Sequence, residues 1–317
     1  FLSGFLITTL LRLEHEQHGR INLRDFYLRR ALRIWPPFYA ILLMAVLGTA
    51  FGVVGGRLLP GPLLAQALHF NNYWSIFRGT DGIPLGAGVY WSLAIEEHFY
   101  LLFPWIFRAL HRGLRTPGPR AWVLWWLCAA ILAWRCVLVF GLRVPEDRTY
   151  MGSDTRFDSI LFGCALALYR NPMLDAPSPG ARAWKWVLFP AALALLAFTF
   201  LYRDPGFRET FRYTLQGIGL VPVFVVAIRH PEWGPMRLLN TRPMRFVGVL
   251  SYSLYLLHHV VLGVFHQRSP GHPVVQGVLA LGVCVGIAWA IHVAVEKPAA
   301  RLRRRLSRAV VTARAAG

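Results

Sequence analysis

Long apolar runs separated by short polar stretches make up most of this chain. Most runs are about 20 residues long, which is enough for a helix to cross the hydrocarbon core of a bilayer. The opening run, Phe1–Leu11, has about half that length and is interpreted as the inner half of a further helix. The pattern predicts an all-α, polytopic membrane bundle with nine spans: the opening half-helix, Ile34–Val54, Tyr90–Leu110, Ala121–Gly141, Phe157–Tyr169, Trp184–Leu201, Phe211–Ile228, Phe246–Phe265 and Val274–Val295.

Two stretches depart from this simple alternation. The connection Gly55–Val89 is rich in Gly and Pro and contains an amphipathic piece, Leu63–Phe77, that we expect to dip into the membrane without crossing it. The span Phe157–Tyr169 is short, so we expect its outer end to include Thr155 or earlier residues.

Composition agrees with a membrane protein. The hydrophobic fraction is 56%, the charged fraction 15% and the mean hydropathy +0.44, outside the range of ordinary soluble domains. The net charge of +19 raises the question of a nucleic-acid partner, but the 34 Lys and Arg residues lie between the apolar runs rather than in one patch. We therefore expect no nucleic-acid partner.

The basic residues predict orientation. If the segment Arg12–Arg33 is cytoplasmic, 24 of them fall on the cytoplasmic side and 9 on the other, with Arg135 inside a span. An excess of Lys and Arg in short loops marks the cytoplasmic face. This predicts a multi-pass protein of the inner (plasma) membrane whose carboxyl terminus is cytoplasmic.

The four cysteines, Cys128, Cys136, Cys164 and Cys284, lie inside apolar runs. No Cys or His spacing suits a metal, and we expect these cysteines to be small core residues and the protein to have no metal site. No phosphate-binding Gly-rich loop and no nucleophile elbow is present in the sequence.

The stretch Tyr90–Trp105, YWSLAIEEHFYLLFPW, places Glu96, Glu97 and His98 inside an apolar run. Ionisable groups in a span are costly and usually face a cavity or a partner. Adjacent side chains point about 100° apart on a helix. We expect one glutamate to line a site and the other to pair with Arg135 or a backbone group, although an ion pair that locks two helices together is an open alternative.

Six sequence blocks resemble the membrane acyltransferase-3 family of integral-membrane O-acyltransferases: SGFLIT (3–8), FYLRRALRIWP (26–36), WSLAIEEHFYLLFP (91–104), TRFDSILFGCALAL (155–168), SYSLYLLHH (251–259) and VEKP (295–298). The resemblance covers residues 1–305, followed by a basic tail, 306–317. It implies ten spans, no bound cofactor, and transfer of an acyl group, acetyl above all, from cytoplasmic acyl-CoA. The acceptor would be a hydroxyl of a carbohydrate or related cell-surface molecule.

Departures from the family pattern affect the predicted chemistry. Family members begin with a further helix carrying a histidine that takes the proton of the acceptor hydroxyl, and no position here corresponds to it. We therefore interpret the chain as truncated at its amino terminus. His98 stands where the family usually has glutamine, and His259 where an aromatic residue is common.

The resemblance and the charge pattern together give a candidate site. Arg29, Arg30 and Arg33 would bind the phosphates of the donor, since guanidinium groups suit phosphate; anchoring by the positive-inside rule is the alternative. The predicted catalytic groups are Glu96, Glu97 and His258, with Glu96 the functional carboxylate. His258 lies in a span near Tyr252 and Tyr255, and a structural role for it is equally open.

Arg156, Asp158 and Tyr255 are the predicted acceptor-binding residues. Arg156 and Asp158 would form the outer wall of the site by hydrogen bonding to sugar hydroxyls. Asp154, Arg156 and Asp158 also lie at the start of a predicted helix, where capping and helix-dipole complementation are the alternative explanation.

A transporter that moves an acyl group or a small solute without transferring it is the main competing function. It would share the bundle and the buried acids, but we find neither inverted repeats nor matching broken helices in the sequence. A structural or sensory membrane protein is a third reading.

Overall fold

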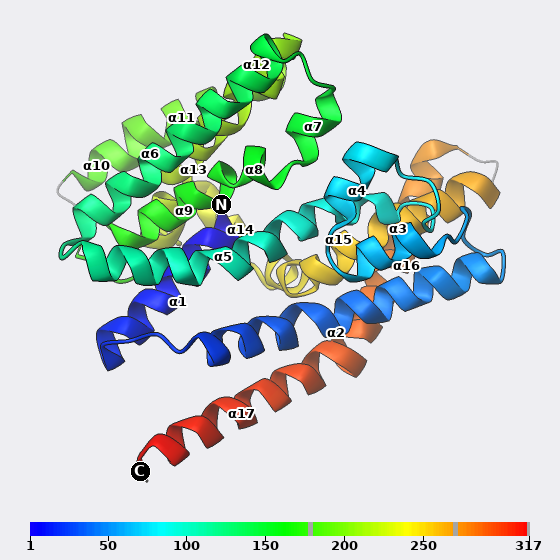
Figure 1. Cartoon of the computed structure of the whole chain (residues 1–317), viewed down its shortest axis with the longest axis horizontal. Coiled ribbons are helices and arrows are strands. Elements are labelled where there is room, and N and C mark those ends of the chain that lie inside the picture. Colours follow the sequence, from blue (N-terminus) through cyan, green and yellow to red (C-terminus); the bar gives the residue numbers. More distant parts are fainter. Residues whose placement is uncertain (177–179, 269–271, 316–317) are drawn as a thin grey trace. The chain divides into compact units, whose positions relative to one another are not determined.

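Every regular element of the described chain is helical. The computed structural model describes residues 1–176, 180–268 and 272–315, and in these ranges a single isolated antiparallel bridge joins Gly56 and Pro84. The helices, drawn in Figure 1, are α1 (Leu2–His18), α2 (Leu23–Ala50), α3 (Pro60–Ala67), α4 (Asn71–Arg78), η1 (Ala87–Tyr90), α5 (Trp91–Gly113), α6 (Pro117–Cys136), η2 (Val137–Gly141), α7 (Glu146–Met151), α8 (Ser153–Arg156), α9 (Asp158–Leu168), α10 (Ala181–Ala183), η3 (Trp184–Leu188), α11 (Phe189–Leu201), α12 (Pro205–Glu209), α13 (Phe211–Arg229), α14 (Gly234–Leu239), α15 (Arg242–Arg268), α16 (Pro273–Ile291), η4 (His292–Glu296) and α17 (Lys297–Ala315).

In the described part of the chain, six helical segments are long and apolar enough to cross a membrane, so this is a multi-pass membrane protein. They are Leu23–Ala50, Pro117–Gly141, Trp184–Leu201, Phe211–Arg229, Arg242–Arg268 and Pro273–Leu306. The predicted count of nine is not confirmed. The other three predicted spans correspond to α1 with 17 residues, α9 with 11 residues, and α5, which has 23 residues but carries two glutamates, two arginines and two histidines.

Helix α2 begins earlier than the sequence analysis predicts. Asn22 caps it by accepting a hydrogen bond from the backbone N–H of Asp25 at 3.3 Å, as expected for a helix amino terminus. The predicted polar connection Arg12–Arg33 is therefore largely helical. Arg12 lies on α1, Arg20 lies in the short link between the two helices, and the other arginines lie on the first turns of α2, because Leu, Arg and Ala favour helix whether or not the segment is apolar.

The connection between α2 and α5 contains α3, α4 and η1, and α3 and α4 together overlap the range Leu63–Phe77 predicted to be amphipathic. The short predicted span Phe157–Tyr169 is α9, and α8 begins at Ser153 just before it. Helical turns therefore start ahead of Thr155, as the length of that run indicates.

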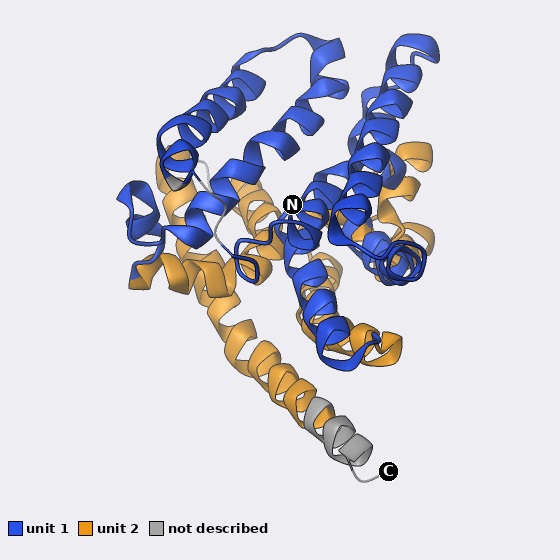
Figure 2. Ribbon diagram, turned by 90° about the vertical axis from the view of Figure 1, so that its left-hand side faces the viewer, with its two compact units in different colours: residues 1–21, 95–241 blue, residues 22–94, 242–317 orange. Residues whose placement is uncertain are grey.

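The chain divides into two units, coloured separately in Figure 2. Unit 1 comprises residues 1–21 and 95–241, and α9 forms its centre, since ten of its eleven residues are buried. Helices α1, α6 and α13 pack against α9. Gly4 of α1 and Gly163 of α9 permit the closest approach, because a Cβ on Gly4 would lie 2.1 Å from the Ile160 carbonyl oxygen.

Unit 2 comprises residues 22–94 and 242–317, in which α15 packs against α16 and α2, and α17 packs against α2. Two polar contacts fix this packing: the Tyr252 hydroxyl donates to the Ile34 carbonyl at 3.1 Å, and the Ser253 hydroxyl donates to Glu296 at 2.6 Å. Glu296 also contacts His292 in η4, a π-helical turn that joins α16 to α17. Wide π-helical turns of this kind also occur at η2 and η3.

Candidate active site

In unit 1, Glu96 is held by hydroxyl groups. Its carboxylate accepts hydrogen bonds from Ser3 Oγ of α1 at 3.1 Å and from the Tyr100 hydroxyl, one turn further along α5, at 2.6 Å. Tyr100 is buried and Glu96 is half-buried. Two neutral donors orient the carboxylate without neutralising it, so it can still attract a proton or a cation.

The neighbours of Glu96 are half-buried as well. His98 Nδ1 lies 2.7 Å from Ser153 Oγ of α8. The expected partner of the second glutamate is Arg135 or a backbone group. Arg135 does not fill this role, because all three nitrogens of its guanidinium are used elsewhere. They donate to the carbonyls of Thr155 and Thr210 and to the side chains of Asp158 and Thr214, at 2.6–3.1 Å.

Arg135 and Asp158 form a fully buried ion pair. Both side chains are 0% exposed and their N–O distance is 2.7 Å. Asp158 also accepts hydrogen bonds from Thr214 Oγ1 at 3.1 Å and from the Ser159 N–H at 2.8 Å. In this structure Asp158 therefore has structural partners, and its predicted contact with an acceptor stays a prediction.

Arg156 lies against aromatic rings. Its guanidinium carbon is 3.7 Å from the centre of the Tyr213 ring and 5.7 Å from that of Tyr150, which is cation–π geometry. Its Nη1 is buried without a hydrogen-bond partner in the described structure. Glu96, Arg156 and Asp158 all lie within electrostatic reach of residue 1, so they lie near the start of α1. The sequence pattern identified these three residues without predicting that they lie near one another.

In unit 2, His258 lines an apolar groove between α15 and α16. The groove has a volume of about 560 Å³ and is also lined by Ser251, Tyr255 and Cys284. His258 Nδ1 donates to the Tyr255 carbonyl at 2.6 Å. In the neutral imidazole this leaves Nε2 as the proton acceptor.

Tyr255 is 38% exposed and is fixed through its hydroxyl, which lies 2.5 Å from Ser92 Oγ and 2.9 Å from the Val89 carbonyl. Its ring lies 5.5 Å from that of His258, measured between centroids. Tyr255 and His258 therefore share one groove.

His259 belongs to the site region, and sequence analysis had noted it as a family departure without giving it a role. Its ring is 4.5 Å from that of His258, and it lines a second cavity of about 780 Å³ formed by the loops around Gly56 and Thr80–Val89. Gly86 is required there, because its φ is +82° and a Cβ would lie 2.4 Å from the backbone of His259. Two adjacent histidines thus line an apolar groove and a loop cavity.

The predicted donor-binding arginines lie on α2. Arg29 and Arg30 are half-buried and Arg33 is exposed. Packing of α17 against α2 brings Arg303 within electrostatic reach of Arg29, Arg33 and Arg304. The sequence pattern did not single out Arg303 or predict this grouping, since the pairing of distant helices leaves no signal in local periodicity. Repelling cations gathered in this way favour binding of a polyanion.

The structure groups the predicted site residues into two sets. Glu96, Glu97, Arg156 and Asp158 belong to unit 1, whereas Arg29, Arg30, Arg33, Tyr255 and His258 belong to unit 2. The predicted cavity that joins Glu96 to His258 therefore stays a prediction.

A family model described as an acyltransferase domain matches residues 1–293. The chain belongs to the acyltransferase-3 family. Its similarity to curated members covers most of its length. It is 27% identical over 272 residues to the peptidoglycan O-acetyltransferase OatA of Listeria monocytogenes, covering 82% of this chain and 43% of OatA.

Two further relatives carry related names. A putative O-acetyltransferase of Staphylococcus aureus is 28% identical over 284 residues, covering 84% of this chain and 45% of that protein. The putative peptidoglycan O-acetyltransferase YrhL of Bacillus subtilis is 28% identical over 314 residues, covering 94% of this chain and 49% of YrhL. The chain thus spans less than half the length of these relatives. No solved structure matches it.

Proposed function

We propose that this acyltransferase moves an acetyl group from cytoplasmic acetyl-CoA to a hydroxyl of peptidoglycan or a related cell-wall polymer. The names of the curated relatives support the group transferred and the type of acceptor. The structural observation that carries the proposal is the carboxylate of Glu96, held by Ser3 and Tyr100 within the helical bundle of unit 1. A carboxylate kept in such surroundings is a candidate for function rather than packing.

The reaction transfers an acyl group from the thioester sulfur of the donor to a hydroxyl oxygen of the acceptor. The acceptor hydroxyl attacks the thioester carbonyl carbon, forming a C–O bond and a tetrahedral oxyanion. The oxyanion collapses with cleavage of the C–S bond, and the thiolate of CoA takes up the proton that the hydroxyl releases. The protein must hold that proton in transit and stabilise the oxyanion.

The described residues supply groups for each task. His258 Nε2 is the proton acceptor in our proposal, since Nδ1 is occupied by the Tyr255 carbonyl. Glu96 orients the acceptor by its negative charge. Arg156, whose Nη1 has no partner in the described structure, is the candidate oxyanion donor. Arg29, Arg33 and Arg303 bind the donor phosphates.

Transfer of label tests the proposal. The purified protein in nanodiscs is incubated with acetyl-CoA labelled in its acetyl group and with soluble peptidoglycan fragments, and label in the fragments is measured. We expect Glu96→Gln to lower kcat by about 100-fold or more, the scale of a lost proton-handling or electrostatic group. Glu14→Gln, on the same unit but away from Ser3 and Tyr100, is the matched control and should leave kcat unchanged.

Other outcomes point elsewhere. Full activity of Glu96→Gln would remove Glu96 from the mechanism. Uptake of labelled acetate or acetyl-CoA into proteoliposomes, without label in any acceptor, would favour the transporter alternative. Loss of activity together with loss of the monodisperse chromatographic peak would indicate that Glu96→Gln misfolds. Tyr100→Phe removes one hydrogen-bond donor to Glu96 and keeps the ring, so its activity would then decide whether Glu96 takes part in the mechanism.

A further inference from the structure

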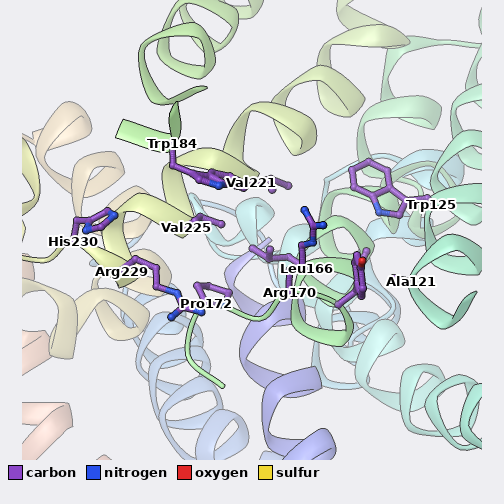
Figure 3. Close-up of a pocket in the computed structure, with 12 residues that line it drawn as sticks. Ala121, Trp125, Leu166, Arg170, Pro172, Trp184, Val221, Val225, Arg229 and His230 are labelled. Atoms are coloured by element: carbon purple, nitrogen blue, oxygen red, sulfur yellow. The ribbon is translucent and has the colours of Figure 1, made fainter. Parts of the chain in front are cut away.

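A cavity of about 440 Å³ in unit 1 lies apart from the groups discussed so far. Helices α6, α9 and α13 and the first residue of η3 form its walls, and Figure 3 shows the residues that line it. Most of the lining is apolar: Ala121, Trp125, Ala165, Leu166, Val221 and Val225. The volume falls within the range of about 300–1,000 Å³ that is usual for ligand sites.

The cavity lies near one end of these helices. It takes its lining from the last turns of α9 and α13 and from the beginning of α6 and η3. Trp125 and Trp184 on its wall suit the interfacial region, where tryptophan is enriched. A ligand there would have its apolar part between the helices and its polar part at the bilayer surface.

Basic side chains gather at this end of the cavity. Arg170, Arg229 and His230 all line it (Figure 3). Arg229 is oriented by hydrogen bonds from its Nη2 to the Asp175 and Asn171 carbonyls. Burial lowers the pKa of His230, and the nearby cations Lys185 and Arg229 lower it further.

Arg170 is the most exposed of these groups. It has a left-handed φ of 61°, which is unfavourable for a residue with a side chain. Its guanidinium stacks 5.3 Å from the centre of the Tyr169 ring, and among the described residues no carboxylate pairs with it. Strained backbone that places an unpaired cation at the cavity is typical of a ligand contact.

The nearest acid does not neutralise this site. Asp175 is within electrostatic reach of Arg229, but its carboxylate oxygens accept hydrogen bonds from Arg12 at 2.5 and 3.0 Å and from the Asn171 N–H at 2.8 Å. The cations that line the cavity therefore outnumber the available anions, and an external anion would complete the site.

We propose that this cavity binds one anionic phospholipid, with an acyl chain against Leu166, Val221 and Val225 and the phosphate on Arg170 and Arg229. Arginine binds phosphate by paired hydrogen bonds, and basic pockets between membrane helices are suited to anionic headgroups. The lipid would tie α6, α9 and α13 together from the surface. The proposal does not depend on acyl transfer.

Retention of lipid by the purified full chain tests it. The protein in detergent is titrated with dioleoyl-phosphatidylglycerol or dioleoyl-phosphatidylcholine, which have identical chains, and bound lipid is counted by native mass spectrometry. We expect about a fivefold or greater preference for phosphatidylglycerol, as for one to two basic contacts at a membrane surface. Arg170→Gln should reduce that preference to below about twofold.

Matched variants distinguish lipid binding at this cavity from nonspecific attraction of anionic lipid to the positive charge of the protein. Arg203→Gln changes an exposed arginine outside the cavity and should keep the full preference. Val225→Trp fills the cavity and should lower retention of both lipids. Equal retention of the two lipids by the unmodified protein, or an unchanged preference in Arg170→Gln, would overturn the proposal. Stronger retention of palmitoyl-CoA than of phosphatidylglycerol would also overturn it, by making the cavity an acyl-CoA site.

Discussion

The Arg135–Asp158 pair shows how a single buried contact organises unit 1. Arg135 of α6 reaches Thr155, Asp158, Thr210 and Thr214, which lie on or beside α8, α9 and α13. Burying an ion pair costs much desolvation energy, but burying either charge without its partner would cost more. The pair therefore fixes which helix faces meet.

Removing one partner of this pair should destabilise the protein strongly. Arg135→Met leaves Asp158 buried and uncompensated, so we expect the free energy of unfolding to fall by about 3–5 kcal/mol. Unfolding in mixed micelles, followed by tryptophan fluorescence, measures it. Arg237→Met breaks a 4.0 Å pair whose side chains are 79% and 82% exposed, and it should leave unfolding unchanged. Equal effects of the two variants would contradict this account.

Asp175 gives a pH dependence with a definite sign. The hydrogen bonds from Arg12 lower the pKa of Asp175 below its ordinary value of 3.8. A lowered pKa contributes stability above the ordinary value, and that contribution is lost as pH falls through the folded-state pKa. Asp175→Asn should cost roughly 1 kcal/mol at neutral pH, as for a partly exposed pair. It should also flatten the acid loss of stability below pH 3.8, measured by unfolding from pH 7 to pH 3.

Sequence analysis found the ionisable residues but not their partners. Glu96, Arg156, Asp158 and His258 stand out because charge is unusual in apolar runs. Which helix faces which is decided by packing between distant segments, and adjacent positions cannot reveal it. Arg135 therefore pairs with Asp158 rather than with a glutamate of α5, and the cavity lined by His259 has no signal in the sequence.

At the scale of elements, the α1–α9 contact depends on two glycines. Gly4→Ala would place a methyl group 2.1 Å from the Ile160 carbonyl and 2.9 Å from Cys164 Sγ, so the helices must separate. We expect a loss of about 1–3 kcal/mol in the free energy of unfolding. Gly286→Ala in α16 meets nothing within 4 Å. This control should be neutral or slightly stabilising, and a similar loss there would remove the packing explanation.

Helix α17 carries a prediction that rests on the proposed donor site. Arg303→Gln should raise KM for acetyl-CoA several-fold and leave kcat unchanged, because Arg303 would contact phosphates rather than reacting atoms. The effect should shrink as salt is raised. Arg301→Gln lies two positions away and about 200° around the helix. It serves as the control, and an equal rise in its KM would argue for a diffuse field instead of a site.

The apolar helices were the most predictable elements. Phe211–Ile228 and Trp184–Leu201 agree closely with α13 and with η3 plus α11, because a long apolar run has few alternatives in lipid. The start of α2 was missed, since Leu23–Arg33 is helical without being apolar. The π-helical turns η2, η3 and η4 had no signal in the patterns used.

At the scale of the molecule, the charge pattern predicts one orientation. Arg301 should lie on the cytoplasmic side and Arg203 on the opposite side. Cysteines introduced at these positions, in a background lacking the four native cysteines, are treated in intact cells with a membrane-impermeant maleimide. Arg203→Cys should be labelled, and Arg301→Cys should be labelled once the cells are permeabilised. The reverse pattern would invert the topology and move the arginines of α2 away from cytoplasmic acyl-CoA.

The π-helical turn η4 has a consequence for the arginines beyond it. A π-helical turn holds one residue more than an α-helical turn needs, so it sets the angular phase of everything downstream. Deleting Val293 would restore ordinary winding and rotate the following helix by about 100° relative to α16. The face that now carries Arg303 toward Arg29 and Arg33 would then point elsewhere, with the composition of the helix unchanged. In this protein one inserted residue sets the direction in which the arginines of α17 point.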